Sequence, residues 1–149
     1  MQSLIVYNAS GNSSSRLATR LRELVNFDSQ VRDVGECLSS EVMQPFDLLL
    51  FLCPTYGDQE LQADMETFSL VNHTGMVGKQ YAVVSMGTYD GYDWFEPMGG
   101  MFLHRYLQSI QCEPILKPDA ILTFPFVDWP AFDRWVDKLN AWHHLNVRH

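Results

Sequence analysis

The chain has 149 residues, of which 46% are hydrophobic and 13% aromatic, enough for the core of one globular domain. Its 18 acidic and 10 basic residues give a formal net charge of −8, which argues against binding to nucleic acid or an anionic membrane, because phosphate groups are bound by clustered Lys and Arg. No apolar segment approaches the roughly 20 residues that cross a bilayer, and the three widely spaced cysteines fit neither a disulfide framework nor a zinc site. We therefore expect a single domain over residues 1–149, cytoplasmic, with reduced thiols and no bound metal.

Short apolar runs predict the central strands of a parallel sheet. Three of them are nearly continuous in hydrophobic residues, which is typical of strands that helices cover on both faces. Two weaker strand patterns come between and after them. The predicted strands, in chain order, are Leu4–Tyr7, Gln30–Val34, Asp47–Cys53, Tyr81–Met86 and Ile115–Phe124.

Helical periodicity lies between and after these strands. Leu17, Leu21, Leu24 and Val25 recur at the spacing of one buried helix face, and a second such pattern comes near the C-terminus. The segment Gly35–Met43 is ambiguous. The second pattern consists of Phe132, Trp135, Val136, Leu139 and Trp142, and weaker helices are predicted over Leu61–Leu70 and Pro97–Ile110.

Strands that alternate with helices, joined by right-handed crossovers, predict an α/β fold. Five strands in a chain of this length fit a doubly wound parallel sheet, flavodoxin-like in its strand order 2-1-3-4-5. Such sheets bind ligands at the carboxyl ends of the strands, where the strand order reverses. The loops after the first, third and fourth strands therefore form the candidate functional site.

The first of these loops reads "NASGNSSSR", from Asn8 to Arg16. A glycine and several hydroxyl groups at the start of a helix can place backbone N–H and Ser O–H donors around a phosphate, helped by the positive end of the helix dipole. The loop lacks the Lys-Ser/Thr ending of nucleoside triphosphate loops and has a single glycine of the dinucleotide fingerprint. It favours a monophosphate, and an ordinary Ser-rich N-cap is the alternative.

The second loop reads "CPTYGDQEL", from Cys53 to Leu61. Pro54 and Thr55 are expected to end the strand and to leave Tyr56 at the sheet edge, where its ring can lie against an aromatic ligand. Gly57 has no Cβ, so its peptide can rotate to offer a carbonyl or an N–H to the ligand. A plain Tyr-Gly turn is the alternative.

The third loop reads "MGTYDGYDWFEPMGG", from Met86 to Gly100. It places Tyr89, Tyr92, Trp94 and Phe95 in one glycine-punctuated segment, with more aromatic surface than a connection normally exposes. A nucleobase and a flavin both fit between two aromatic walls. In the alternative interpretation, Trp94 and Phe95 cap the core and only the tyrosines face outward.

Together the three loops resemble those of flavodoxins. "NASGNS" is similar to the flavodoxin phosphate loop, "PTYGD" to the second loop with its stacking aromatic residue, and "YDWF" to the third loop with its second stacking tyrosine. The resemblance covers essentially the whole chain, and the lack of a long insertion in the last strand makes it similar to the short-chain group. The chain departs from the family in a shorter first loop, with Asn8 and Ala9 in place of hydroxyl-bearing residues, and in Thr88, where many members have an acid.

This resemblance implies noncovalent FMN, one-electron transfer, and neither catalytic residues nor a metal. It implies that the first loop holds the phosphate and that Tyr56 faces one side of the flavin. Tyr92 would face the other side, with Tyr89 as the alternative. The cofactor-binding residues that the resemblance implies are Asn8, Ala9, Ser10, Gly11, Asn12 and Ser13 of the first loop, Pro54, Thr55, Tyr56, Gly57 and Asp58 of the second, and Met86, Gly87, Thr88, Tyr89, Tyr92, Trp94 and Phe95 of the third.

Acidic residues beside these loops bear on the redox chemistry and on the partners. A Gly57 carbonyl turned toward the protonated flavin favours the neutral semiquinone, whereas nearby carboxylates oppose addition of the second electron. We expect a monomeric flavoprotein of electron transport that cycles between semiquinone and hydroquinone and docks on basic-surfaced redox proteins, a flavin reductase and an acceptor. The carboxylates are those of Asp58, Glu60, Asp64, Asp90, Asp93 and Glu96.

Two other functions use the same architecture. An FMN-dependent NAD(P)H:quinone-type reductase usually needs a substrate pocket completed by insertions or by oligomerisation, for which this chain has no spare length. A flavin-free interaction module would keep the fold without the cofactor.

The five histidines show no metal-ligand spacing with acids or thiols. We predict that they lie at the surface or at its boundary, and that Cys53 is a small apolar filler of the core rather than a nucleophile. The histidines are His73, His104, His143, His144 and His149.

Overall fold

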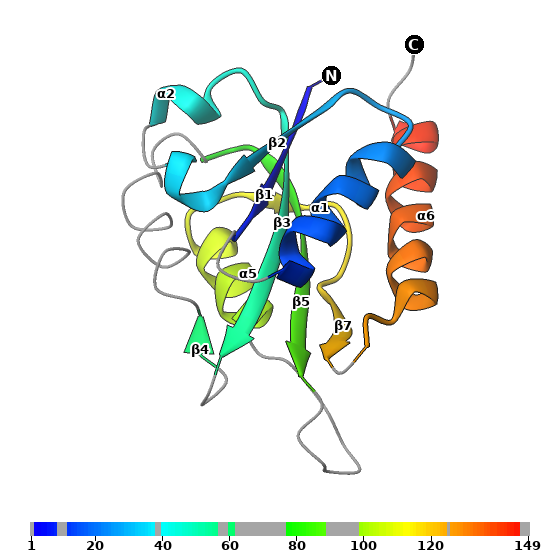
Figure 1. Ribbon diagram of the computed structural model, residues 1–149. Coiled ribbons are helices and arrows are strands. Elements are labelled where there is room, and N and C mark those ends of the chain that lie inside the picture. The colour runs from blue at the N-terminus through cyan, green and yellow to red at the C-terminus, as the bar shows by residue number, and fades with distance from the viewer. Residues whose placement is uncertain are drawn as a thin grey trace.

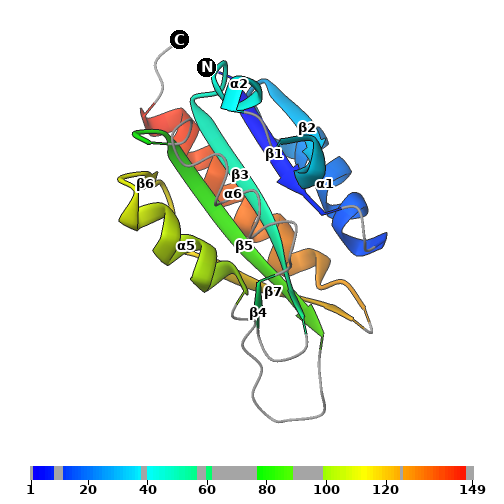
Figure 2. The same ribbon diagram turned by 90° about the vertical axis from the view of Figure 1, so that its left-hand side faces the viewer.

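A parallel sheet runs through the middle of the molecule, with helices on both of its faces (Figure 1 and Figure 2). The computed structural model describes residues 2–8, 12–37, 40–56, 60–61, 77–88, 99–124 and 126–146. Within these ranges, no helix is both long enough and apolar enough to cross a membrane.

The order of the strands confirms the predicted topology. The parallel strands are β1 (Ser3–Tyr7), β2 (Ser29–Asp33), β3 (Leu48–Tyr56), β5 (Gln80–Thr88), β6 (Glu113–Pro114) and β7 (Asp119–Phe124). They lie in the order β2-β1-β3-β5-β6, with β7 also paired to β5, and all of these pairs are parallel. Since β3 occupies one edge of β5, the strands β6 and β7 share the other edge. With β5 as the fourth strand and β6 and β7 in the fifth position, the order is 2-1-3-4-5.

The fifth position holds two strands instead of the single strand predicted over Ile115–Phe124. Ile115 still donates its backbone N–H to the Tyr81 carbonyl at 2.9 Å, but the next paired residue is Asp119. Pro118 lies in the gap and has no N–H to donate to the ladder. The prediction of one continuous strand is therefore wrong between residues 115 and 118.

The side chains of the strands alternate between two cores, one on each face of the sheet. Leu4 of β1 belongs to the core that includes Leu103 of the yellow-green helix α5, whereas its neighbour Ile5 belongs to the core that includes Leu17 and Trp135. The helices α1 and α6 therefore cover one face, and α5 covers the other (Figure 2). The helices are α1 (Asn12–Leu24), a 3-10 turn η1 (Val34–Cys37), α2 (Ser40–Met43), α5 (Gly99–Ser109) and α6 (Trp129–Asn146).

Polar contacts hold α1 against α6 at both ends of their shared interface. The Arg20 guanidinium donates two hydrogen bonds to the Asp133 carboxylate, at 2.8 and 2.7 Å. The Asn140 side chain accepts a hydrogen bond at 2.8 Å from the backbone N–H of Asn26, which lies just past the end of α1. It also donates at 2.9 Å to the carbonyl of Leu24, the last residue of α1. These contacts fix the direction of α1, whose first turn follows β1.

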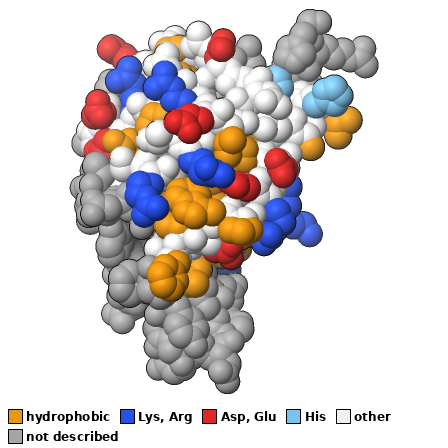
Figure 3. Space-filling view, turned by 45° about the vertical axis from the view of Figure 1, so that its right-hand side comes forward, with side chains coloured by type: hydrophobic (Ala, Val, Ile, Leu, Met, Phe, Trp, Pro, Cys, Tyr) orange, Lys and Arg blue, Asp and Glu red, His pale blue; other side chains and the backbone are white. Residues whose placement is uncertain are grey.

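Aromatic and basic side chains meet on the outer surface of this interface. The guanidinium groups of Arg16 and Arg20 lie over the Trp129 ring, 5.4 and 5.2 Å from its centroid. Figure 3 brings the α6 side forward and shows hydrophobic side chains set among basic and acidic ones. Stacking of this kind adds to the packing of the exposed ends of α1 and α6.

The predicted helices at Leu17–Val25, Pro97–Ile110 and Phe132–Trp142 are confirmed as α1, α5 and α6, although residues 97 and 98 of the second one lie outside the described residues. Leu61, the first residue of another predicted helix, instead lies in the short strand β4 (Glu60–Leu61), and the rest of that helix lies outside the described residues. The ambiguous segment after β2 forms η1 and α2.

One histidine prediction is wrong. His143 is only 5% exposed, and its ring lies 4.9 Å from that of Phe27. It follows Leu139 by four residues and so continues the buried face of α6. His144 is exposed, because it lies on a different face of the helix.

Candidate functional site

The carboxyl ends of β1, β3 and β5 lie at one end of the sheet, because these strands are parallel neighbours. The arrowheads of β3 and β5 in Figure 1 point to that end. The three loops singled out from the sequence leave these strand ends, after Tyr7, Tyr56 and Thr88. The topology therefore brings the beginnings of the three loops to the same end of the sheet.

This end of the sheet has a step. The pairing of β1 with β3 ends where Val6 pairs with Phe51, but β3 continues as far as Tyr56. At about 3.3 Å per residue, β3 runs roughly 16 Å beyond that last pair. The strand β5 extends alongside it, since Pro54 pairs with Met86. A ligand above the end of β1 would therefore lie beside the extended ends of β3 and β5.

A hydrogen bond joins the end of β1 to the first turn of α1. Asn8 is 2% exposed, and its backbone N–H donates to the Ser14 hydroxyl oxygen at 3.2 Å. Ser14 is 3% exposed and shares a helix face with Leu17, Ala18 and Leu21, which pack against the sheet. The Ser14 hydroxyl thus fixes both ends of the first loop.

Sequence reasoning stopped at Ser13 and missed Ser14. The signal was present, because positions 14, 17, 18 and 21 follow the spacing of one helix face. A serine at the first position of an otherwise apolar face indicates a polar contact at the helix start.

The first turn of α1 follows the end of β1, at the same end of the sheet as this site. Asn12 and Ser13 are in that turn, which contains no acidic residue. The first N–H groups of a helix have no partner within the helix, and the helix dipole places partial positive charge there. These groups fit the recognition of an anion such as a phosphate.

The end of β3 differs from the sequence-based expectation that Pro54 and Thr55 end the ladder. Pro54 pairs with Met86 of β5, and Thr55 and Tyr56 pair with the antiparallel strand β4. Leu48 donates its N–H toward β1, so residues at even positions of β3, including residue 54, face that edge. The pairing with β1 has already ended at Phe51, so the missing N–H of Pro54 removes no ladder hydrogen bond.

The end of β5 also extends further than predicted. Met86 and Gly87 are buried within the strand, and the Gly87 carbonyl accepts a hydrogen bond from the Thr123 hydroxyl at 3.2 Å. Met86 packs in the core beneath α1 and α6. The register with β7 shifts between Gly87 and Thr88, and such irregularities re-aim the chain at the end of a strand.

The structure describes only part of the predicted cofactor-binding set. Asn8, Met86 and Gly87 are described in full. For several others only the backbone is described, and the rest remain predictions. The backbone-only residues are Asn12, Ser13, Pro54, Thr55, Tyr56 and Thr88, and those outside the described residues are Ala9, Ser10, Gly11, Gly57, Asp58, Tyr89, Tyr92, Trp94 and Phe95.

The three cysteines are buried and carry reduced thiols, as predicted. Burial raises the pKa of Cys37 to about 12 and that of Cys112 to about 11, and it raises the pKa of Cys53 as well. Cys53 packs in the core, as expected of a small apolar filler. In the described part of the chain, no group of three or more His, Cys, Asp or Glu side chains is placed to hold a metal ion.

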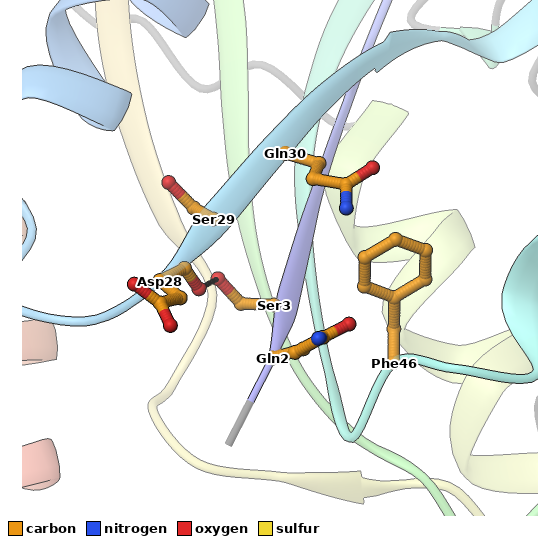
Figure 4. Close-up of a pocket in the computed structure, with 6 residues that line it drawn as sticks. All are labelled: Gln2, Ser3, Asp28, Ser29, Gln30 and Phe46. Carbon is orange, nitrogen blue, oxygen red and sulfur yellow. Dashed lines mark hydrogen bonds between the residues drawn. The ribbon is translucent and has the colours of Figure 1, made fainter.

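A cavity of about 240 Å³ lies at the opposite end of the sheet, at the amino ends of β1 and β2. Figure 4 shows Gln2, Gln30 and Phe46 on one side of β1 and Asp28 on the other. The Ser3 hydroxyl donates to the Asp28 carbonyl at 2.8 Å. This cavity is therefore separate from the site at the carboxyl ends of the strands.

Comparison with known proteins confirms the fold. No protein-family model matches the sequence. The structure is similar to that of oxidised flavodoxin 1 from Bacillus cereus, with a TM-score of 0.73, 18% sequence identity and 99% of each chain covered. A flavodoxin from the domain Archaea gives a TM-score of 0.78 at 13% identity over 97% of this chain and 98% of its own. A Fusobacterium nucleatum flavodoxin bound to flavin mononucleotide gives 0.68 at 13% identity over 97% of this chain and 95% of its own. The chain thus has the flavodoxin fold that its loops predicted.

Proposed function

We propose that the chain is a single-domain electron carrier that binds FMN noncovalently and passes electrons between a reductase and an acceptor protein. The observation that carries this proposal is that the three strands from which the loops start end at one stepped end of the sheet. The flavodoxin fold and the FMN bound by the Fusobacterium nucleatum protein support it. Bound FMN would supply the one-electron redox chemistry, and the protein would bind and orient it.

The phosphate side of this site rests on β1 and α1. The hydrogen bond from Asn8 to Ser14 fixes the loop that begins at residue 9, and the acid-free first turn of α1 favours an anion. Hydrogen bonds to a charged group contribute about 1.5–3 kcal/mol each, so a few of them hold a phosphate without a lysine. The residues that would hold it are Asn8, Ser10, Gly11, Asn12 and Ser13.

The ring side of this site rests on β3 and β5. Tyr56 would stack on one face of the flavin, and Tyr92, or Tyr89, on the other. The carbonyl or N–H of Gly57 would face the flavin edge and respond to its protonation. Both strands run beyond the last residue of β1 that is paired with β3, so their extended ends would lie beside a ligand bound above the end of β1.

The formal net charge of −8 supports partners with basic surfaces. We propose that a monomer in the cytoplasm presents the flavin edge to a reductase and then to an acceptor. Such association slows as salt is added, because the charges that steer it are screened within about 8–10 Å at physiological ionic strength. Electron transfer that is independent of salt would contradict this role for the acidic residues.

A titration of the apoprotein with FMN tests the proposal. We expect binding at one site, quenching of flavin fluorescence and a change in the visible spectrum during stepwise reduction. Turnover of NAD(P)H with a quinone by the purified protein alone would instead support a reductase. A colourless protein that does not bind added FMN would support a flavin-free interaction module.

A further inference from the structure

A cleft of about 300 Å³ lies between α5 and the gap that separates β6 from β7. This volume is at the lower end of the range for small-molecule sites. Figure 2 shows α5 and β6 next to each other, and β6 pairs with the first residues of β5. The cleft is therefore distinct from the carboxyl ends of the strands, where the flavin site is proposed.

The lining of the cleft combines apolar walls with basic groups. Ile115, Leu116 and two prolines provide the apolar part, and the ionisable residues of the lining are His104 and Lys117. No Asp or Glu is among the lining residues, although the chain has 18 acidic residues. Two acids flank the lining segment Pro114–Pro118: Asp119 is paired with Lys138 at 3.4 Å, and Glu113 is exposed and is not among the described lining residues. The cleft thus favours an anion with an apolar part.

The inner side of the His104 ring is fixed by a buried tyrosine. The Tyr81 hydroxyl lies 2.8 Å from His104 Nδ1 and 3.3 Å from the His104 carbonyl oxygen, and Tyr81 is 1% exposed. Burial raises the pKa of Tyr81, so its hydroxyl keeps its proton. The Tyr81 hydroxyl has one proton to donate, and we assign it to the shorter contact, at Nδ1, rather than to the carbonyl oxygen; the proton of a neutral His104 ring is then on Nε2.

The other ring nitrogen of His104 is available to a ligand. No residue that the structure describes forms a hydrogen bond with Nε2, and His104 is one of the residues that line the cleft. Burial lowers the pKa of His104, as does Arg105 beside it, so the ring is neutral near physiological pH. Its Nε2–H is then one fixed donor, and the Lys117 ammonium group supplies a charged one.

We propose that this cleft binds a small carboxylic acid with a short apolar chain. The carboxylate accepts hydrogen bonds from His104 Nε2–H and from the Lys117 ammonium group, and the apolar chain packs against Ile115 and Leu116. No covalent step is involved, and binding does not depend on the flavin.

Titration of the purified full chain with hexanoate, followed by heteronuclear NMR, tests this assignment. We expect saturable shifts confined to α5 and residues 113–118, and a His104 ring signal that reports the proton on Nε2. The uncharged analogue hexanamide should bind at least about tenfold more weakly, because it loses the charge-assisted contacts. Equal binding of the two compounds, shifts centred elsewhere or no saturable shift would overturn the assignment.

Two substitutions separate the cleft from general electrostatics. Lys117→Gln should weaken hexanoate binding about fivefold, which corresponds to the loss of one exposed ion pair. Arg22→Gln removes the same charge from the exposed surface of α1, on the other face of the sheet, and should leave the affinity unchanged. An equal loss in both variants would overturn the role of Lys117.

A third substitution, His104→Gln, should weaken hexanoate binding about tenfold. If that variant does not fold, the comparison of Lys117→Gln with its control and the His104 ring signal of the wild-type protein decide the result.

Discussion

The Ser14 hydroxyl offers the sharpest test of how the first loop is held. Ser14→Ala removes the acceptor of the Asn8 backbone N–H, a donor that lies in a buried part of the structure. The substitution leaves the buried face of α1 otherwise unchanged. We therefore expect it to act on the connection between β1 and α1 and, through it, on FMN binding.

The expected loss of stability follows from two opposing effects. A buried donor left without an acceptor costs about 1–3 kcal/mol, whereas alanine in place of serine favours the helix by about 0.5 kcal/mol. The net loss is about 0.5–2.5 kcal/mol, which lowers the melting temperature of a domain of this size by roughly 1–10 °C. A loop displaced by the same free energy should bind FMN about tenfold more weakly.

Urea unfolding of the apoprotein and fluorescence titration with FMN measure the two effects. Ser15→Ala is the matched control, because Ser15 is exposed and, among the residues that the structure describes, its hydroxyl has no hydrogen-bond partner, whereas its backbone carbonyl accepts from the Thr19 hydroxyl. The control should keep wild-type FMN affinity and gain up to about 0.5 kcal/mol of stability. If Ser14→Ala behaves like Ser15→Ala in both assays, the hydroxyl does not hold the loop.

Three further predictions concern the rest of the fold. A double-mutant cycle with Arg20→Ala and Asp133→Ala should give a coupling of about 0.2–1 kcal/mol, since both side chains are partly exposed, and a zero coupling would contradict a stabilising role. The hydrogen bond from Arg20 lowers the pKa of Asp133, so this coupling should be fully present above the ordinary pKa of an aspartate and should disappear as the pH falls through the lowered pKa of Asp133. Urea unfolding of the four proteins of the cycle at several pH values measures this. The thiols of Cys37, Cys53 and Cys112 should not react with a thiol reagent at mildly alkaline pH until the protein unfolds, because burial raises their pKa values. Rapid reaction of the folded protein would refute this. Trp135→Phe should change stability by only about 1 kcal/mol, because the buried Trp135 Nε1 has no hydrogen-bond partner among the described residues, whereas Trp135→Ala should cost about 3–5 kcal/mol.

The sheet could be predicted from the sequence because its central strands are buried on both faces. The hydrophobic runs that begin at Leu4, Leu48 and Tyr81 are nearly continuous, which is typical of parallel strands that helices cover on both faces. The strands β1, β3 and β5 contain these runs. The helices α1 and α6 were predictable for a similar reason, because their apolar faces are long and regular.

The errors lie where local signals compete with tertiary context. Pro54 is a strand breaker by its residue type, yet its backbone nitrogen faces an edge of β3 along which the pairing with β1 has already ended. Pro118 is where the fifth strand is interrupted, in the segment Lys117-Pro118-Asp119 that separates the apolar pairs Ile115-Leu116 and Ala120-Ile121. His143 is buried because α6 packs against Phe27, a contact between distant parts of the chain that periodicity only hints at.

The candidate site could be predicted in part. The strand order places the three loops at one end of the sheet, and Asn8 lies there at the end of β1. Ser14 was missed because a serine run beside a loop was interpreted as part of the loop, whereas Ser14 belongs to the buried face of α1. The aromatic residues of the second and third loops stay predictions.

Parallel titrations of the apoprotein with FMN and with riboflavin test the central claim most directly. The two ligands share the ring system and differ in the phosphate, so the ratio of their affinities reports the binding of the phosphate beside the first turn of α1. Two or more charge-assisted hydrogen bonds, at about 1.5–3 kcal/mol each, predict that FMN binds at least about 100-fold more tightly. Equal affinities, or no binding of either flavin, would contradict the assignment of this end of the sheet as an FMN site.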